Sequence, residues 1–240
     1  MRVYAITDVG KVRPINEDSF YLPKEGELFC AVADGMGGHN AGEVASALAV
    51  KTFAASMRAS EKLSGTAIQH AVSRANEEVH EEARFDSGKA GMGTTFTALC
   101  KDGDCVHIAH VGDSRAYLLR NGAMMQVTMD HTLVEEMVMQ GLITPKEAKV
   151  HPKRNYITRA LGTKSHVEID LVQIELREGD VFLLCTDGLS SHAEERRIQE
   201  ISKSDEDWNE KLKKLVNCAL ENGGSDNITA MYVTFEEGHE

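Results

Sequence analysis

The chain has 240 residues, of which 42% are hydrophobic and 27% charged, and its formal net charge is −12. These ordinary globular values exclude a disordered, collagen-like or coiled-coil chain. The acidic charge argues against nucleic acid and against an anionic membrane surface as partners. No apolar run approaches the ~20 residues that a membrane helix needs.

The chain is expected to be cytoplasmic and to form one domain over residues 1–240. Asp8 interrupts the N-terminal segment before a signal-peptide core could form. The five cysteines include no C-x-x-C pair, and we interpret them as reduced, structural thiols of a reducing compartment. No segment has the composition of a linker or a repeat.

The first part of the chain predicts two strands followed by two helices. The strands are expected at about 2–8 and 28–33, where apolar residues dominate. Apolar residues at helical spacing predict helices at about 41–58 and 65–84. Ser64 is the expected N-cap of the second helix.

The middle of the chain predicts an antiparallel meander at about 93–128. Asp102-Gly103 and Asn121-Gly122 each separate two strand-like segments. Such dipeptides supply the positive φ angles of two-residue hairpin turns. Thr144-Pro145-Lys146-Glu147 then forms a capping box that predicts a helix start.

The last part of the chain predicts three strands and a long helix. The strands are expected at about 168–175, 180–185 and 228–235. The helix begins with acidic residues at 205–207 and ends at Gly223-Gly224.

The order of these elements favours the α+β class. Successive strands are antiparallel and the helices are grouped in sequence, which argues against a doubly wound sheet. Several strands are apolar on both faces, so each sheet must be covered on both sides. A four-layer α-β-β-α sandwich with two central antiparallel sheets satisfies both observations.

Four aspartates stand at the ends of predicted strands. Asp34, Asp113 and Asp187 follow apolar runs, and Asp226 precedes the last strand. Each could be a simple turn former, but several acids gathered at one edge repel one another unless a cation binds. Oxygen ligands favour Mg²⁺ or Mn²⁺. Two such ions can serve phosphoryl hydrolysis, although an acidic edge without function remains an alternative at this point.

The segment RPINED at 13–18 adds an arginine to this acidic set. The guanidinium of Arg13 has the two-pronged geometry that suits phosphate. A polar turn, or a salt bridge to one of the nearby carboxylates, would account for it equally well.

Eight ordered motifs resemble one known family. RPINED, VADGMGGHNAGEVAS, GMGTTFTAL, AHVGDSRAYLL, DHTLV, HPKRNYITRALG, CTDGL and GGSDNIT are similar to the bacterial branch of the metal-dependent protein Ser/Thr phosphatases, the PPM family of type 2C. The resemblance extends from about residue 5 to residue 234 and implies the α-β-β-α sandwich with metals at one edge between the sheets.

The resemblance implies a role for each matching residue. The main site would hold two Mn²⁺ or Mg²⁺ ions, and a third, weaker ion is possible. The matching positions are Asp34 as the bridging carboxylate, Gly35 as a carbonyl ligand, Asp187 and Asp226 as the remaining ligands, Asp18 as a holder of metal-bound waters, Asp113 as a ligand of the third ion, Arg13 as the phosphate-binding arginine, and about 141–157 as a flap beside the site.

Some positions depart from the family pattern or carry no assigned role. Met36 stands where some members have a histidine proposed as general acid, and that role is not transferred to His39. The segment SSHAEERR after CTDGL is less typical than the other motifs. His107 and His110 are expected to be sheet residues, whereas His131 could support the site or belong to a helix cap.

The resemblance implies hydrolysis of phosphoserine and phosphothreonine in proteins by a metal-activated water. Phosphorylated proteins would be the substrates, and a bacterial Ser/Thr protein kinase would be the opposing enzyme. Two alternatives remain: a hydrolase of small phosphate esters, and a non-catalytic regulator that binds phosphoproteins. The intact set of acids argues against the regulator.

Overall fold

The structure is a computed structural model that describes residues 1–37 and 41–235. His39 lies outside the described residues. Two antiparallel sheets form its centre. The first contains, in spatial order, β1 (Arg2–Asp8), β11 (Ile228–Thr234), β10 (Val181–Cys185), β7 (Arg115–Arg120) and β8 (Ala123–Gln126). The second contains β2 (Asp18–Tyr21), β3 (Phe29–Met36), β5 (Phe96–Asp102), β6 (Cys105–Val111) and β9 (Asp170–Glu175), with β4 (Gly93–Thr94) paired to β3.

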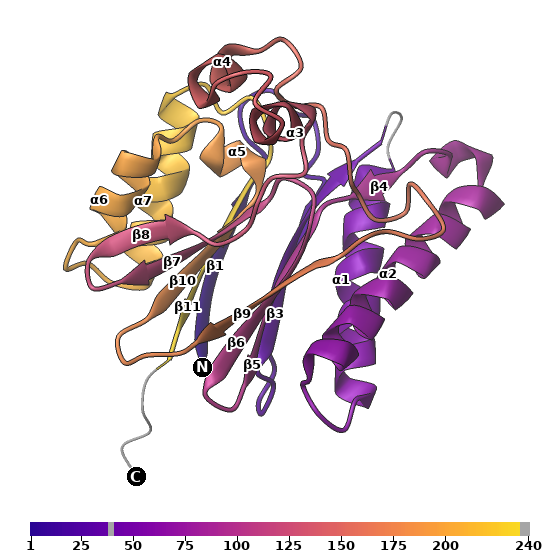
Figure 1. Ribbon diagram of the computed structural model, residues 1–240, viewed down its shortest axis with the longest axis horizontal. Helices are drawn as coiled ribbons and strands as arrows, with labels where there is room; N and C mark the ends of the chain where they lie inside the picture. Colours follow the sequence, from indigo (N-terminus) through magenta and orange to yellow (C-terminus); the bar gives the residue numbers. More distant parts are fainter. Residues whose placement is uncertain (38–40, 236–240) are drawn as a thin grey trace.

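Helices cover the outer faces of both sheets (Figure 1). Two of them, α1 (Gly42–Ala59) and α2 (Gly65–Phe85), lie against the sheet that contains β3. The opposite outer face carries α5 (Asp187–Ser190), α6 (Glu195–Ser202) and α7 (Trp208–Glu221). A short 3₁₀ helix, η1 (Ser87–Lys89), follows α2, and α3 (Leu133–Met139) and α4 (Pro145–Val150) lie beyond one end of the strands. The predicted α-β-β-α sandwich is confirmed.

Three separate apolar clusters explain why the central strands are apolar on both faces. One cluster lies between α1, α2 and their sheet, and another between α6, α7 and theirs. The third lies between the two sheets. Alternate residues of one strand serve different clusters: on β10, Leu183 faces the helices while Phe182 and Leu184 face the other sheet. Each fully buried side chain of this size stabilises the fold by ~1.5–3 kcal/mol.

The predicted meander at 93–128 is wrong in its middle. Both hairpins form, with positive φ at Gly103, Asn121 and Gly122. However, β6 and β7 belong to different sheets. The chain crosses between the sheets at Gly112, whose φ is +113° and where a Cβ atom would lie 2.6 Å from the side chain of Thr95. Glycine is required there by both conformation and space.

The helix ends agree closely with their sequence signals. Ser64 accepts a hydrogen bond from the Ala67 amide, and Asp207 caps α7. Thr144 and Glu147 form the complete capping box of α4. The short elements β2, α5 and α6 were not predicted, because, unlike the equally short β10 and α4, they have neither a long apolar run nor a capping box. Within the described ranges, no helix is long and apolar enough to cross a bilayer.

Candidate active site

The topology brings the predicted aspartates to the same end of the sandwich. Asp18 opens β2 and lies directly opposite Asp34 of β3. Asp113 lies in the crossing from β6 to β7, and Asp187 is the first residue of α5, separated from β10 by Thr186 alone. Asp226 precedes β11. Acids from both sheets therefore meet at the seam between them, close to α5 in Figure 1.

Asp18 is tied across the seam by hydroxyl groups of the other sheet. Its Oδ2 accepts hydrogen bonds from Thr186 Oγ1 at 2.9 Å and from Thr229 Oγ1 at 2.7 Å. Burial raises the pKa of Asp18 to about 7, against the lowering effect of the two threonines. The carboxylate is therefore rigidly placed, with one oxygen fixed and Oδ1 free.

Backbone contacts fix Asp34, and its carboxylate lies within hydrogen-bond reach of Asp187. Its amide donates to Thr95 Oγ1 at 2.9 Å, and its carbonyl accepts from Thr94 Oγ1 at 2.8 Å. Burial, followed by the charges of Asp18 and Asp187, raises the pKa of Asp34 well above its usual value. At the adjacent Gly35 a Cβ atom would lie 2.1 Å from the Gly42 carbonyl oxygen, so only glycine fits.

Asp113 and Asp187 complete the buried part of the acidic cluster. Burial and then the charge of Asp187 raise the pKa of Asp113 to about 8. Burial and then the charge of Asp226 raise the pKa of Asp187. Each group is therefore costly to ionise while its neighbours are also ionised.

The donor set fits a hard divalent cation. Among the described residues, Oδ1 of Asp18, Asp113 and Asp187 is buried and has no hydrogen-bond partner. Leaving a buried polar atom unpaired costs ~1–3 kcal/mol, and a cation would relieve this cost and the repulsion together. In the described part of the chain, no three acidic, histidine or cysteine side chains form a ready-made cage.

Arg13 lies at the rim and forms a salt bridge to the cluster. Its Nη2 donates to Asp226 Oδ2 at 2.8 Å, and 46% of its side chain is exposed. The structure thus contains a salt bridge of the kind that the sequence left open as an alternative for Arg13. The exposure leaves the guanidinium accessible to an incoming ligand.

Asn227 organises the loop of Arg13 and was not singled out from the sequence. Its Nδ2 donates to the carbonyls of Val9 and Ile15, both at 2.9 Å. Its Oδ1 accepts the amide of Glu17 at 2.8 Å. Only 3% of Asn227 is exposed. Its place directly after a predicted ligand, in GGSDNIT, is visible in the sequence, but its burial and its partners are not.

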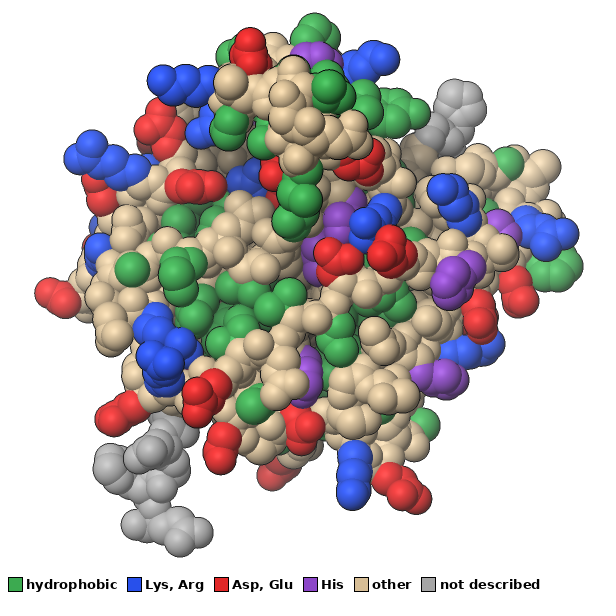
Figure 2. All heavy atoms as spheres, in the orientation of Figure 1, with side chains coloured by type: hydrophobic (Ala, Val, Ile, Leu, Met, Phe, Trp, Pro, Cys, Tyr) green, Lys and Arg blue, Asp and Glu red, His purple; other side chains and the backbone are tan. Residues whose placement is uncertain are grey.

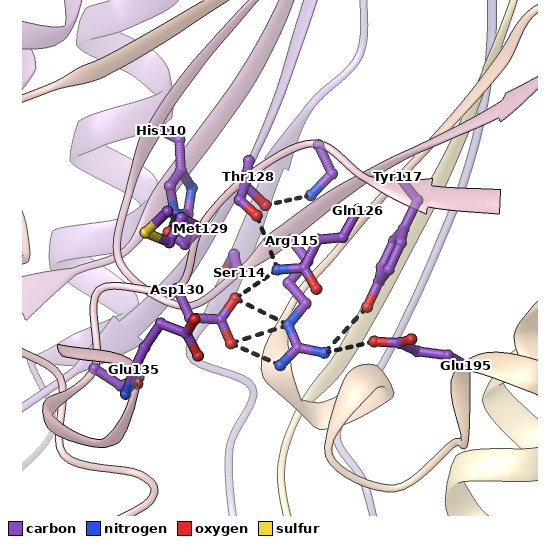
Figure 3. A network of polar contacts seen from close by, with 12 residues as sticks. His110, Ser114, Arg115, Tyr117, Gln126, Thr128, Met129, Asp130, Glu135 and Glu195 are labelled. Carbon is purple, nitrogen blue, oxygen red and sulfur yellow. Dashed lines mark hydrogen bonds and ion pairs between the residues drawn. The ribbon is translucent and has the colours of Figure 1, made fainter. Parts of the chain in front are cut away.

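A second arginine near the site has a structural role (Figure 3). Arg115 donates through Nε and Nη2 to Asp130, at 2.6 Å for the shortest contact, and through Nη1 to Tyr117. Gln126 also donates to Asp130 at 2.9 Å. Both prongs of Arg115 are therefore occupied, and it joins the start of β7 to the segment that leads into α3.

The histidines separate into sheet and site-supporting residues. His107 and His110 are buried on β6, as expected, and His110 contacts Thr97 Oγ1 at 2.9 Å. His131 accepts the amide of Gly112 on Nδ1 at 3.0 Å, directly beside Asp113. Thr132, not His131, caps α3. The geometry thus favours the supporting interpretation of His131.

A cavity of about 800 Å³ opens beside the acids. Asp113 and Asp187 form part of its wall. The α3–α4 region contributes Lys149 and Arg154, and the segment after α5 contributes His192. This space is large enough for a side chain of a partner protein together with its flanking residues.

Without metal, stability should fall as the pH rises from 6.5 to 8. Asp18 and Asp113, with pKa values of about 7 and 8, hold protons in the folded chain that the unfolded chain has lost. The free energy of unfolding therefore decreases through this window. His110, whose pKa burial lowers to about 4, acts in the opposite direction only below 6.5. The melting temperature in EDTA should fall, and excess Mn²⁺ should abolish the fall. A melting temperature in EDTA that stays constant or rises between pH 6.5 and 8 would contradict the raised pKa values of Asp18 and Asp113.

The fold and the seam of carboxylates define the class as a metal-dependent hydrolase. The protein phosphatase 2C family model matches residues 13–231. The serine/threonine phosphatase Stp of Listeria innocua is 38% identical over 95% of this chain and 93% of its own. The crystal structure of the Mycobacterium tuberculosis phosphatase PstP/Ppp aligns with a TM-score of 0.91 at 40% identity, covering 98% of this chain and 99% of that one. A structure of the PstP catalytic domain with two manganese ions aligns with a TM-score of 0.85 at 39% identity, covering 96% of each chain.

The chain belongs to the protein phosphatase 2C family. The predicted family and the predicted class of enzyme, a metal-dependent protein phosphatase, are confirmed.

Proposed function

We propose that this protein removes phosphate from phosphoserine and phosphothreonine in proteins, using two Mn²⁺ or Mg²⁺ ions. Asp34, Asp187, Asp226 and the carbonyl of Gly35 are the proposed ligands. The observation that carries this proposal is the buried group of mutually repelling carboxylates with unpaired oxygens at the seam. When bound, two such ions supply an activated water and offset charge on the phosphoryl group.

The remaining proposed roles follow from what each side chain contacts. Asp18, fixed through Oδ2 by Thr186 and Thr229, presents Oδ1 to water at the metal site. Arg13 is exposed at the rim and directs its guanidinium to phosphate oxygens. No proton donor to the leaving group is assigned, since Met36 carries no acid and His39 lies outside the described residues.

Asp113 is proposed to hold the third, weaker ion. If so, Asp113→Ala should leave two tight Mn²⁺ ions bound, while turnover falls by at least ~10-fold and the Mn²⁺ dependence of the rate changes. Calorimetric counting of bound Mn²⁺ checks this. Loss of one of the two tight ions would place Asp113 in the main pair instead.

The whole chain is proposed to form one phosphatase domain. Within it, the segment 141–157 is proposed as a flap that contacts the substrate protein. Two features support it. The segment borders the cavity beside Asp113 through Lys149 and Arg154. It also exposes Leu142, Val150 and Tyr156. Figure 2 shows hydrophobic side chains at the top of the view, where Figure 1 places α3 and α4.

Substrate class is tested by comparing three kinds of phosphate ester at fixed Mn²⁺. The proposal expects hydrolysis of a phosphothreonine peptide with a kcat/KM well above that for sugar phosphates and nucleotides. Preference for the small esters would support the small-ester hydrolase. Binding of the peptide without release of phosphate would support the non-catalytic regulator.

The setting of the reaction is also a proposal. A phosphatase of this class requires a Ser/Thr protein kinase to supply its substrates. The cytoplasm is the proposed compartment, and it is supported by the five cysteines, each of which is a free thiol.

A further inference from the structure

His192 joins two loops that carry proposed metal ligands. It lies in the atypical segment SSHAEERR, five positions after Asp187. Its Nδ1 is 3.0 Å from the carbonyl oxygen of Gly188, and its Nε2 is 2.9 Å from Ser225 Oγ. Gly188 follows Asp187, and Ser225 precedes Asp226. One imidazole therefore connects the neighbours of both ligands, across 33 residues of chain.

The hydrogen-bond pattern assigns the ring proton. The backbone amide of Ser225 donates to Nε2 at 3.3 Å, so Nε2 is an acceptor. The proton then lies on Nδ1, which donates to the Gly188 carbonyl. The amide of His192 itself donates to the Leu189 carbonyl. In an ideal α-helix the amide of His192 would donate to the Gly188 carbonyl. Here the side chain of His192 donates to that carbonyl instead.

The loop of Asp226 is held from both sides, and His192 contributes to the N-terminal side, where the carbonyl of Gly224 also accepts the amide of Lys11 at 2.8 Å. On the C-terminal side, Asn227 anchors the loop to Val9 and Ile15. On the N-terminal side, Ser225 contacts His192. The imidazole ring also lies beside Gly223: a Cβ atom added to Gly223 would be 3.5 Å from the ring. Gly223 has a φ of +123°, a backbone conformation that glycine adopts without strain.

Both ring nitrogens are occupied by protein groups, so His192 is not placed to exchange a proton with substrate. We infer that His192 is a positioning residue that fixes the distance between the Asp187 and Asp226 loops and thereby the affinity of the metal pair. This inference rests on the proposed metal site. Groups that orient the ligands of metal sites typically contribute 10–100-fold in affinity or activity.

The test measures Mn²⁺ binding by calorimetry on EDTA-treated protein. His192→Ala should weaken Mn²⁺ binding about 10- to 100-fold, while KM for a phosphopeptide at saturating Mn²⁺ stays unchanged and excess Mn²⁺ restores kcat. His192→Gln should recover part of the affinity, because its amide can reach Ser225. His80→Ala is the matched control: His80 Nδ1 contacts the Gly162 carbonyl at 2.9 Å, away from the acids. It should keep wild-type affinity.

Ser225→Ala tests the link without removing the ring. It should weaken Mn²⁺ binding about 2- to 10-fold, the loss of one hydrogen bond. The same change should have no effect in the His192→Ala background, since the two groups form one contact. It also keeps the inference testable if His192→Ala does not fold.

Three results would overturn the inference while leaving the proposed function intact. The first is wild-type Mn²⁺ affinity in His192→Ala. The second is a loss of Mn²⁺ affinity in His80→Ala as large as that in His192→Ala. The third is a double variant, His192→Ala with Ser225→Ala, whose loss of affinity is the product of the two single losses. A wild-type protein that binds no Mn²⁺ would overturn both the inference and the proposed function.

Discussion

Asp187→Asn is expected to abolish turnover while making the metal-free protein more stable. The carboxylate is buried beside other acids, and burial and then the charge of Asp226 raise its pKa. Asparagine keeps the shape but removes the charge, so repulsion in the metal-free fold decreases. A lost metal ligand should lower kcat by more than ~100-fold, the upper range for groups that only orient ligands. Melting temperatures in EDTA and in Mn²⁺, with kcat, measure both effects.

Asp180→Asn is the matched control. Asp180 is also buried, but Arg120 pairs with both of its oxygens, at 2.8 and 2.6 Å. Breaking a buried ion pair costs ~3–5 kcal/mol, so this variant should be less stable with and without Mn²⁺. An Asp187→Asn protein that is destabilised in EDTA to the same extent would show that Asp187 is a structural acid.

Arg13→Ala is expected to lower kcat/KM about 10- to 100-fold. A charge-assisted hydrogen bond to phosphate contributes ~1.5–3 kcal/mol, and Arg13→Lys should recover only part because it lacks the two-pronged geometry. The Mn²⁺ dissociation constant should stay the same or decrease, since Arg13 now occupies Asp226 Oδ2. Steady-state kinetics and calorimetry check the two expectations.

Arg74→Ala provides a control with the same exposure. Arg74 is 46% exposed, as is Arg13, and it pairs with Glu77 and Glu78 on α2. It should leave the kinetics unchanged. If Arg13→Ala instead prevents Mn²⁺ binding and leaves inhibition by free phosphate unaltered, Arg13 is only the salt-bridge partner of Asp226.

Local signals in the sequence were sufficient for the long helices, the hairpins and the aspartates at the strand ends. Ser64, Thr144 and Asp207 cap helices through contacts within three residues along the chain. Asn121-Gly122 forms the expected turn. The other hairpin turns at Gly103-Asp104, one residue later than predicted, because Asp102 still pairs with Cys105. These features depend on neighbours in sequence, so a single chain reveals them.

The parts that were missed depend on contacts between distant residues. Gly112 turns the chain into the other sheet because Thr95 leaves no room for a side chain. Asn227 bonds to carbonyls 212 and 218 positions away, and His192 contacts Ser225, 33 positions away. No local pattern encodes such partners. The aspartates at the strand ends stand out because their chemistry is visible in the sequence, whereas the residues that contact them do not.

The most direct test of metal-dependent catalysis at the carboxylate seam is a Mn²⁺ titration of the EDTA-treated protein that follows bound metal and phosphate release from a phosphothreonine peptide in the same samples. If the carboxylates at the seam bind the catalytic metals, phosphate release should be negligible without metal and should rise to saturation as two ions bind. Both responses should be lost in Asp187→Asn. Phosphate release that is independent of Mn²⁺, or no release at any Mn²⁺ concentration while two ions bind, would contradict it.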